Sequence, residues 1–230
     1  MQVVIFCGGL ATRLGSLSKH IPKSMIEVQG KPFLSYQLDQ LKHHKITDVV
    51  LCVGHLSKHI QSYFKDGSDF GVHITYSYDT EKLLGPIGAL KHAEPHLTST
   101  FFTLYGDSYV FVNYKDIHSY FKEKKAKALM TVYHNNDKYD QSNLVINNDR
   151  VIQYGGQKTA KMTYIDYGVS LFHKSILDDI PNNAFCSTAD FYTKVVQKHQ
   201  LYAYEVDTRF YHIGTPTALT EFKTYIQENS

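Results

Sequence analysis

Apolar and polar positions along the first 135 residues follow two alternating patterns. Short continuous apolar runs, VVIFC at 3–7 and VVLCV at 49–53, are typical of strands buried on both faces of a parallel sheet. Between them, KPFLSYQLDQLKHH places apolar residues at helical spacing from Phe33 onward, and Pro32 suits a first helical turn. The sequence therefore predicts a strand–helix–strand unit at the start of the chain.

The same alternation continues along the chain. HITYSY at 73–78, TFFTLYG at 100–106 and KALMTVYH at 127–134 are predicted strands, and helices are predicted from about Ile87 and over KDIHSYFKEKKA at 115–126. Strands that alternate with helices predict an α/β fold with a doubly wound, mostly parallel Rossmann-like sheet and helices on both faces.

The pattern changes after about residue 135. The predicted elements there are a hairpin at 143–155, a long strand at 164–173, a helix at 188–200, two short strands at 201–207 and 209–214, and a final helix at 216–227. We expect a single domain over 1–230, in which a smaller α+β subdomain at about 136–230 joins the sheet of the first 135 residues.

Composition changes this picture only slightly. The chain is 43% hydrophobic and 20% charged, as is usual for a globular protein, and its net charge of +2 gives no reason to expect a nucleic-acid or membrane partner. The first residues, MQVVIFCGG, do not resemble a signal peptide. The three cysteines lack metal-ligand spacing, and Cys7 and Cys52 fall in predicted buried strands. We therefore expect a cytoplasmic protein.

The segment GGLATRLGSLSKHIPKSM at 8–25 directly follows the first predicted strand. Open α/β sheets bind ligands at this edge, and glycines let the backbone approach an anion closely. Arg13 offers a planar fork for phosphate oxygens, and Lys23 offers a mobile positive charge. The P-loop and dinucleotide patterns are both missing. From these residues alone, a phosphate site and an ordinary strand–helix turn with two surface charges both remain open.

The full segment resembles the signature of the sugar-1-phosphate nucleotidylyltransferases, G-G-x-G-T-R-L followed by P-K-x-M. The resemblance continues through EKLLGPIGAL, LYGDS, YIDYGVSLF and FYHIGTP, and it is nearest to the heptose-1-phosphate and mannose-1-phosphate guanylyltransferase-like group. It implies an enzyme that joins a nucleoside triphosphate to a hexose or heptose 1-phosphate, giving a nucleoside-diphosphate sugar and pyrophosphate, for cell-surface polysaccharide synthesis. GTP is the favoured nucleotide, with CTP or UTP as alternatives.

The resemblance also assigns roles to residues of the nucleotide-binding half, about 1–135. Arg13 would neutralise the leaving pyrophosphate, and Lys23 would contact the reacting phosphates. Asp107 would hold Mg²⁺, a hard cation that prefers oxygen ligands, although it could instead cap the following turn. The residues implied to bind the nucleotide are Gly8, Gly9, Ala11, Thr12, Glu81, Gly85 and Gly88.

On the sugar-phosphate-binding half, about 136–230, the resemblance implies contacts from four positions. These are Asn143, Lys158, Asp166 and Gly168. Lys161 is a rival to Lys158 for the sugar phosphate. The aromatic stretch ALTEFKTYI suits a homodimer interface or packing on the protein's own sheet, and we favour the second.

Two residues depart from the family pattern. Ala11 stands where the signature has glycine, which puts the geometry of the loop in question. His212 stands where D-x-G-T-P has a second metal-binding aspartate, and imidazole suits Mn²⁺ or Zn²⁺ better than Mg²⁺. Asp207 is a substitute five residues earlier. Three hypotheses follow: a metal held only by Asp107 and phosphates, which we favour, a preference for manganese, or nucleotide binding without turnover.

Other functions compete with a sugar nucleotidylyltransferase. His212 motivates a non-catalytic module that binds nucleotide sugars, and a CTP-dependent transferase acting on a non-sugar phosphate such as choline phosphate is a looser fit. A glycosyltransferase would need an Asp-x-Asp motif, whereas Asp107 is followed by Ser108 and Tyr109. The missing dinucleotide pattern excludes a dinucleotide-dependent dehydrogenase.

Overall fold

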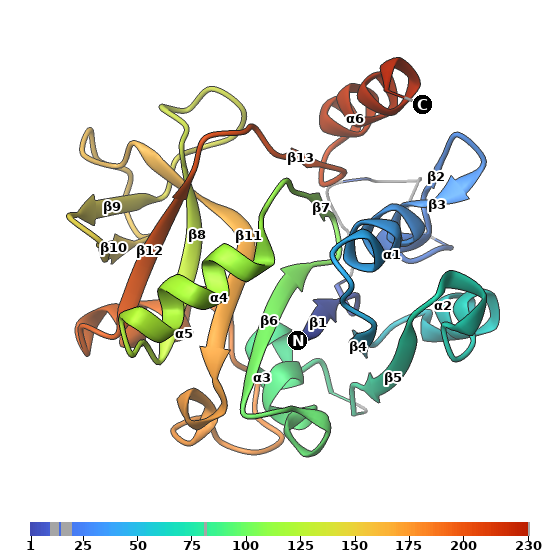
Figure 1. Ribbon diagram of the computed structural model, residues 1–230, viewed down its shortest axis with the longest axis horizontal. Coiled ribbons are helices and arrows are strands. Elements are labelled where there is room, and N and C mark those ends of the chain that lie inside the picture. The colour runs from blue at the N-terminus through green and yellow to red at the C-terminus, as the bar shows by residue number, and fades with distance from the viewer. Residues whose placement is uncertain (10–13, 15–19, 81, 230) are drawn as a thin grey trace.

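A mixed sheet runs through the molecule and takes strands from both halves of the chain (Figure 1). The computed structural model describes all residues except 10–13, 15–19, 81 and 230. Within the described residues the sheet has nine strands in the order β5-β4-β1-β6-β11-β8-β12-β10-β9. These strands are β1 (Gln2–Phe6), β4 (Asp48–Val53), β5 (His73–Tyr78), β6 (Thr100–Tyr105), β8 (Ala128–His134), β9 (Leu144–Asn147), β10 (Arg150–Tyr154), β11 (Tyr164–His173) and β12 (Leu201–Val206).

Helices and short ladders complete the fold. The helices are α1 (Phe33–His43), α2 (Ser57–Phe64), α3 (Gly85–His92), α4 (Tyr114–Glu123), α5 (Thr188–Gln197) and α6 (Pro216–Glu228). Two small ladders join β2 (Glu27–Val28) to β3 (Lys31–Pro32) and β7 (Ser108–Tyr109) to β13 (Tyr211–His212). Short 3₁₀ turns are η2 (Lys23–Met25), η3 (Ser68–Phe70), η4 (Glu94–His96) and η5 (Lys174–Leu177).

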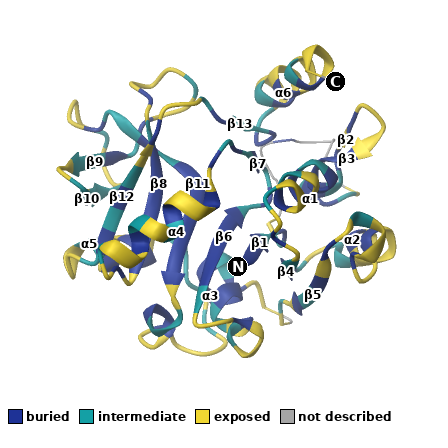
Figure 2. Cartoon of the chain, in the orientation of Figure 1, coloured by how far each residue is buried: buried dark blue, intermediate teal, exposed yellow. Residues whose placement is uncertain are grey.

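The first four strands of the sheet are all parallel. β1 pairs with β4 on one side and β6 on the other, and β5 extends the sheet beyond β4. Both faces of β1 and β4 are covered, which explains their continuous apolar sequence: Val3, Val4 and Ile5 are completely buried (Figure 2). Because the strands are parallel, the loops that follow them all leave from the same edge of the sheet.

Alternate side chains of β1 supply two separate cores. Val3 and Ile5 pack in a cluster with residues of α1, α2 and α4, whereas Val4 packs in a cluster with residues of α3 and α5. This follows from the two-residue repeat of a strand, which directs successive side chains to opposite faces. The helices therefore cover both faces of the sheet, and the expectation of a doubly wound α/β fold is confirmed.

The second half of the chain continues the sheet. β11 lies antiparallel to both β6 and β8, β12 runs parallel to β8, and the hairpin β9–β10 forms the far edge. The parallel pairings are thus confined to the first four strands and the β8–β12 pair. The predicted hairpin and long strand are confirmed.

Two details of the helix predictions differ from the structure. Pro32 is the last residue of β3 and caps α1 in an extended conformation, with φ −57° and ψ 144°, so it lies outside the first turn. Helix α3 begins at Gly85, two residues before the predicted start at Ile87. Pro86 explains the earlier start, because a proline in the first turn needs no backbone N–H partner.

Helix α6 returns to the first half of the molecule and packs on α1 (Figure 1). The ring of Phe222 contacts the ring of Phe33 edge to face, with centroids 5.1 Å apart, and both side chains are completely buried. Leu219 and Ile226 join the same cluster. The aromatic C-terminal stretch therefore packs within its own chain, against α1 rather than the face of the large sheet, and a homodimer stays a prediction.

We expect Phe222→Ala to lower the free energy of unfolding by about 3–5 kcal/mol, because it removes a buried aromatic ring and leaves a cavity against α1. Urea denaturation measures the change, provided that the dependence of the unfolding free energy on urea concentration is the same in both proteins. Ile152→Ala is the control, since Ile152 is 50% exposed and should cost less than about 1 kcal/mol. Equal costs for the two variants would contradict a stabilising contact between α6 and α1.

Candidate active site

The parallel strands deliver several residues with reactive or ligand-binding potential to one edge of the sheet. Gly8 and Gly9 follow β1, Gly54 follows β4, Asp79 follows β5 and Asp107 follows β6. The loops lie so close that a Cβ on Gly8 would be 3.3 Å from the backbone nitrogen of Gly54. This is the edge at which open α/β sheets bind ligands.

Lys23 and Asp107 form an ion pair across this edge. The family resemblance assigned the reacting phosphates to Lys23 and the metal to Asp107. Nζ of Lys23 lies 2.8 Å from Oδ2 of Asp107, and the two side chains are only 19% and 25% exposed. Lys23 is the first residue of the 3₁₀ turn η2, which follows the extended Pro22, whereas Asp107 lies in the two-residue connection between β6 and β7. The structure therefore brings together residues 84 positions apart.

A buried glutamine fixes the turn that carries Asp107. Nε2 of Gln37, on α1, donates to the backbone oxygens of Tyr105 at 2.9 Å and Ser108 at 2.7 Å. Gln37 has no exposed surface, and sequence reasoning missed it. One signal in the sequence could have identified it: Gln37 stands next to Leu38 on the apolar face of the predicted helix. A glutamine buried on that face needs hydrogen-bond partners in a neighbouring segment.

His212 lies beside Asp107 but is poorly arranged for a metal. It pairs with Ser108 in the β7–β13 ladder, and the backbone N–H of Gly214 donates to its Nδ1 at 3.0 Å. A neutral imidazole with an accepting Nδ1 carries its proton on Nε2, which lies 3.9 Å from Oδ2 of Asp140. Neither nitrogen then offers a lone pair to a cation.

Asp107 is therefore the described carboxylate best placed for a metal. Asp207 is exposed and accepts a hydrogen bond from Thr208 at 3.2 Å. In the part of the chain that the structure describes, no group of three or more His, Cys, Asp or Glu residues gathers in a way that could hold a metal ion by itself.

Three of the four residues predicted for the sugar side lie together. Oδ1 of Asn143 accepts from the backbone N–H of Asp166 at 3.2 Å, and the carboxylate of Asp166 accepts from the N–H of Gly168 and the hydroxyl of Tyr105, each at 2.9 Å. Burial raises the pKa of Asp166 to about 6, although these hydrogen bonds oppose the shift. The polar cluster formed by Asn143, Asp166 and Gly168 is thus tied to β6 through Tyr105.

A bulge in β11 places this cluster beside the Asp107 turn. The pairing of β11 with β8 shifts register between Asp166 and Ser170, and Gly168 takes φ +104°, which favours glycine. A Cβ on Gly168 would lie 3.2 Å from the side chain of Ser108, the residue after Asp107. Glycine is needed here for the two segments to approach each other.

Lys158 has a structural role in its own half. Its ammonium group contacts Oδ1 of Asp137 at 2.6 Å and the backbone oxygens of Ser142 and Met162, each at 3.0 Å. These three partners use all the hydrogen-bond donors of a lysine. Binding of the sugar phosphate by Lys158 stays a prediction, and the rival Lys161 is exposed.

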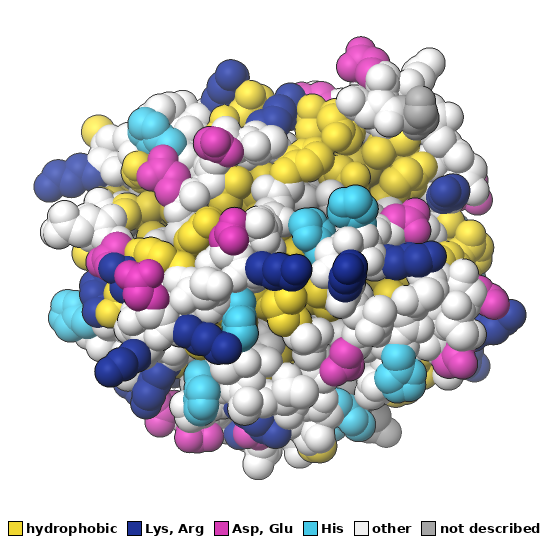
Figure 3. Space-filling model, viewed as in Figure 1, with side chains coloured by type: hydrophobic (Ala, Val, Ile, Leu, Met, Phe, Trp, Pro, Cys, Tyr) yellow, Lys and Arg dark blue, Asp and Glu magenta, His cyan; other side chains and the backbone are white. Residues whose placement is uncertain are grey.

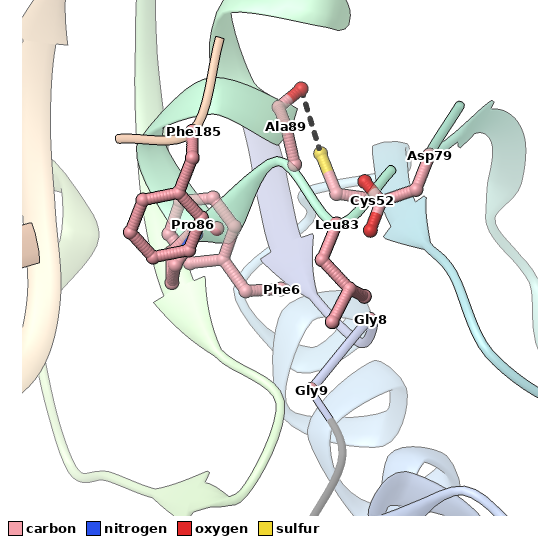
Figure 4. Close-up of a pocket in the computed structure, with 10 residues that line it drawn as sticks. Phe6, Gly8, Gly9, Cys52, Asp79, Leu83, Pro86, Ala89 and Phe185 are labelled. Carbon is pink, nitrogen blue, oxygen red and sulfur yellow. Dashed lines mark hydrogen bonds between the residues drawn. The ribbon is translucent and has the colours of Figure 1, made fainter. Parts of the chain in front are cut away.

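A pocket opens next to Gly8 and Gly9 (Figure 4). Gly85, predicted to bind the nucleotide, lines it. Gly88 lies elsewhere: its N–H donates to the oxygen of Cys186 at 3.4 Å, and a Cβ there would be 2.4 Å from the oxygen of Ala184. Its lack of a side chain therefore serves loop packing, and its contact with a nucleotide stays a prediction.

Of the residues that line this pocket, only Gly8, Gly9 and Gly85 were predicted from the sequence. Those that were missed include Cys52, Asp79 and Phe185. Phe185 comes from the second half of the chain, about 100 positions from Gly85, so nothing in its local sequence connects it to the pocket. The predicted site residues Ala11, Thr12, Arg13 and Glu81 lie outside the described residues.

The surface carries charges of both signs. Figure 3 shows basic, acidic and histidine side chains interspersed over one face of the molecule. None of the helices in the described residues is long and apolar enough to cross a membrane.

The raised pKa of Asp166 predicts a pH dependence of stability. Between about pH 4 and 6 the folded protein keeps a proton on this carboxyl that the unfolded chain releases, so the contribution of Asp166 to stability falls as the pH rises. We expect Asp166→Asn, which cannot ionise, to remove this fall. Urea denaturation of both proteins at several pH values measures the difference, and parallel curves would contradict the raised pKa.

Known proteins resemble the chain along nearly its whole length. D-glycero-alpha-D-manno-heptose 1-phosphate guanylyltransferase from Campylobacter jejuni is 32% identical over 216 residues, covering 94% of this chain and 96% of that protein. The protein of the same name from Aneurinibacillus thermoaerophilus is 30% identical, and the match covers 94% of each chain. Mannose-1-phosphate guanyltransferase from Saccharomyces cerevisiae is 25% identical, and the match spans 62% of its length.

Solved structures share the fold. HddC from Yersinia pseudotuberculosis superposes with a TM-score of 0.85 at 24% identity, covering 98% of this chain and 99% of that one. The family model described as nucleotidyl transferase matches residues 2–229. Because this match covers nearly the whole chain, it shows that the chain belongs to the nucleotidyl transferase family.

Proposed function

We propose that this enzyme transfers a nucleotidyl group from a nucleoside triphosphate, with GTP favoured, to a hexose or heptose 1-phosphate. The products are a nucleoside-diphosphate sugar and pyrophosphate. The observation that carries the proposal is the Lys23–Asp107 pair at the strand edge, with the cluster of Asn143, Asp166 and Gly168 beside it. The names of the guanylyltransferases that the chain resembles support the same chemistry.

Charge governs the reaction, because an oxygen of one phosphate attacks the α-phosphorus of another. The protein therefore has to align two anions and neutralise their negative charge. Lys23, held at the edge of the sheet, supplies a cation at the reacting phosphates. Arg13 supplies a second cation for the leaving pyrophosphate, a role that rests on the family signature.

The described residues fit a divalent cation held mainly by substrate. Magnesium is commonly bound by one or two carboxylates together with substrate phosphates. Asp107 offers one carboxylate, and among the described residues its Oδ1 accepts a hydrogen bond only from the hydroxyl of Ser108, at 3.5 Å. When bound, the cation would neutralise phosphate charge. Mg²⁺ is the proposed ion, with Mn²⁺ as the alternative.

The cellular setting remains part of the proposal. A nucleoside-diphosphate sugar is an activated donor of glycosyl groups. We therefore place the enzyme in the cytoplasm, where its product would supply the synthesis of cell-surface polysaccharide. The polar cluster that includes Asp166 offers acceptors and donors for sugar hydroxyls, which favours a sugar over choline phosphate.

Pyrophosphate release tests the proposed function. We expect it with GTP and at least one hexose or heptose 1-phosphate, and we expect Lys23→Met to lower kcat/KM by about 10²–10³-fold, as for loss of a group that stabilises transition-state charge. Lys65→Met is the control, because the side chain of Lys65 is 69% exposed. No release above background with any nucleotide and sugar phosphate would instead favour a non-catalytic binding module.

A metal comparison tests the role of His212. We expect the wild-type protein to turn over with Mg²⁺, because Asp107 and the substrate phosphates suffice to hold the ion, and we expect His212→Asp to leave the choice of metal unchanged. Steady-state rates with Mg²⁺ and with Mn²⁺ provide the measurement, and melting temperatures control for folding. Turnover of the wild type with Mn²⁺ alone, together with use of Mg²⁺ by His212→Asp, would show this expectation to be wrong.

A further inference from the structure

The pocket beside Gly8 and Gly9 has two unlike walls. Phe6, Pro86 and Phe185 form an apolar wall suited to the flat face of a base, and Asp79 lies on the opposite side near Cys52 and Leu83 (Figure 4). Asp79 is the one carboxylate among the described residues that line this pocket. The proposed transfer reaction makes no use of it.

The fold holds the Asp79 carboxylate in a fixed place. The backbone N–H of Asp79 donates to the oxygen of Val53 at 2.8 Å, which anchors the residue directly after β5. Its Oδ2 occupies space that a side chain on Gly54 would need, since a Cβ there would lie 2.8 Å away. The same oxygen lies 3.4 Å from the Cβ position of Gly8. The absence of a side chain on Gly54 therefore makes room for this carboxylate.

The carboxylate has unused hydrogen-bonding capacity. No described residue donates a hydrogen bond to its oxygens, and partial burial raises its pKa. Partial burial costs a carboxylate some of its water, and no donor from the described residues replaces that water. A ligand that brings donors into the pocket would remove this cost.

We propose that Asp79 determines which base the enzyme accepts, by receiving hydrogen bonds from N1–H and the 2-amino group of guanine. This inference rests on the proposed function and names the base for it. Guanine presents two adjacent donors on this edge, which match the two oxygens of a carboxylate. The ring of the base would lie against Phe6, Pro86 and Phe185.

The other bases match this carboxylate less well. Adenine and cytosine each present one amino group next to a ring nitrogen acceptor, and uracil presents one N–H between two carbonyl groups. Each would direct a lone pair at a carboxylate oxygen, which adds repulsion to the loss of a hydrogen bond. A bidentate contact discriminates between bases by about 10- to 100-fold.

Equilibrium binding of GTP, ITP and XTP to the full chain tests the inference without any need for turnover. Xanthine has a carbonyl where guanine has the 2-amino group, so the amide of Asp79→Asn can accept from N1–H and donate to that carbonyl. We expect the wild type to bind GTP best and Asp79→Asn to bind XTP best, with the GTP-to-XTP affinity ratio falling by about 100-fold. ITP lacks the 2-amino group and should bind the wild type about tenfold more weakly than GTP.

Two further variants keep the result interpretable. Asp79→Ala should bind GTP and ITP equally, because neither carboxylate oxygen remains. Asp178→Asn, at an exposed aspartate outside the pocket, should keep the wild-type preference, and melting temperatures report whether each variant is folded.

An unchanged ratio of GTP to XTP affinity in folded Asp79→Asn would overturn the inference, as would equal binding of GTP and ITP by the wild type. Guanine-selective binding without pyrophosphate release would overturn the proposed function and leave the role of Asp79 standing. Turnover with GTP, combined with an unchanged GTP-to-XTP affinity ratio in Asp79→Asn, would support the proposed function and overturn the role of Asp79.

Discussion

The ion pair between Lys23 and Asp107 is the interaction on which the candidate site depends. It links the loop after β1 to the end of β6 across the strand edge, and both side chains are largely shielded from water. In a partly buried setting each charge would be costly without the other. Gln37 adds a second constraint, because its amide holds the backbone on both sides of Asp107. The anionic substrates would therefore meet a charge arrangement that is already in position.

Strand β6 connects the two sides of the proposed reaction. On one side it is parallel to β1, which leads to the segment proposed to bind phosphates, and on the other it is antiparallel to β11, which carries Asp166 and Gly168. The bulge in β11 and the positive φ of Gly168 let this strand approach Ser108 closely. A single shared strand thus places the polar cluster of the second half beside the acidic turn of the first.

The pocket next to Gly8 is likewise assembled from segments distant in sequence. Its lining comes from the ends of β1, β4 and β5, the start of α3, and the loop that carries Phe185. That loop can reach the pocket because Gly88 has no side chain to obstruct Ala184. The shape of the pocket therefore depends on Gly88, which does not line it, as well as on the side chains that do.

Much of the fold could be read from the sequence, because strands buried on both faces and amphipathic helices leave local patterns that do not depend on distant contacts. The signature segment and Asp107 were recognised because short motifs around them resemble those of a known family, and such motifs are local in the sequence. The sequence did not reveal that Gln37 supports the Asp107 turn or that Lys158 forms an ion pair with Asp137. Nor did it reveal that Asp79 and Phe185 line the same pocket. These facts depend on which strand lies beside which and how closely two loops approach, and only tertiary packing decides that.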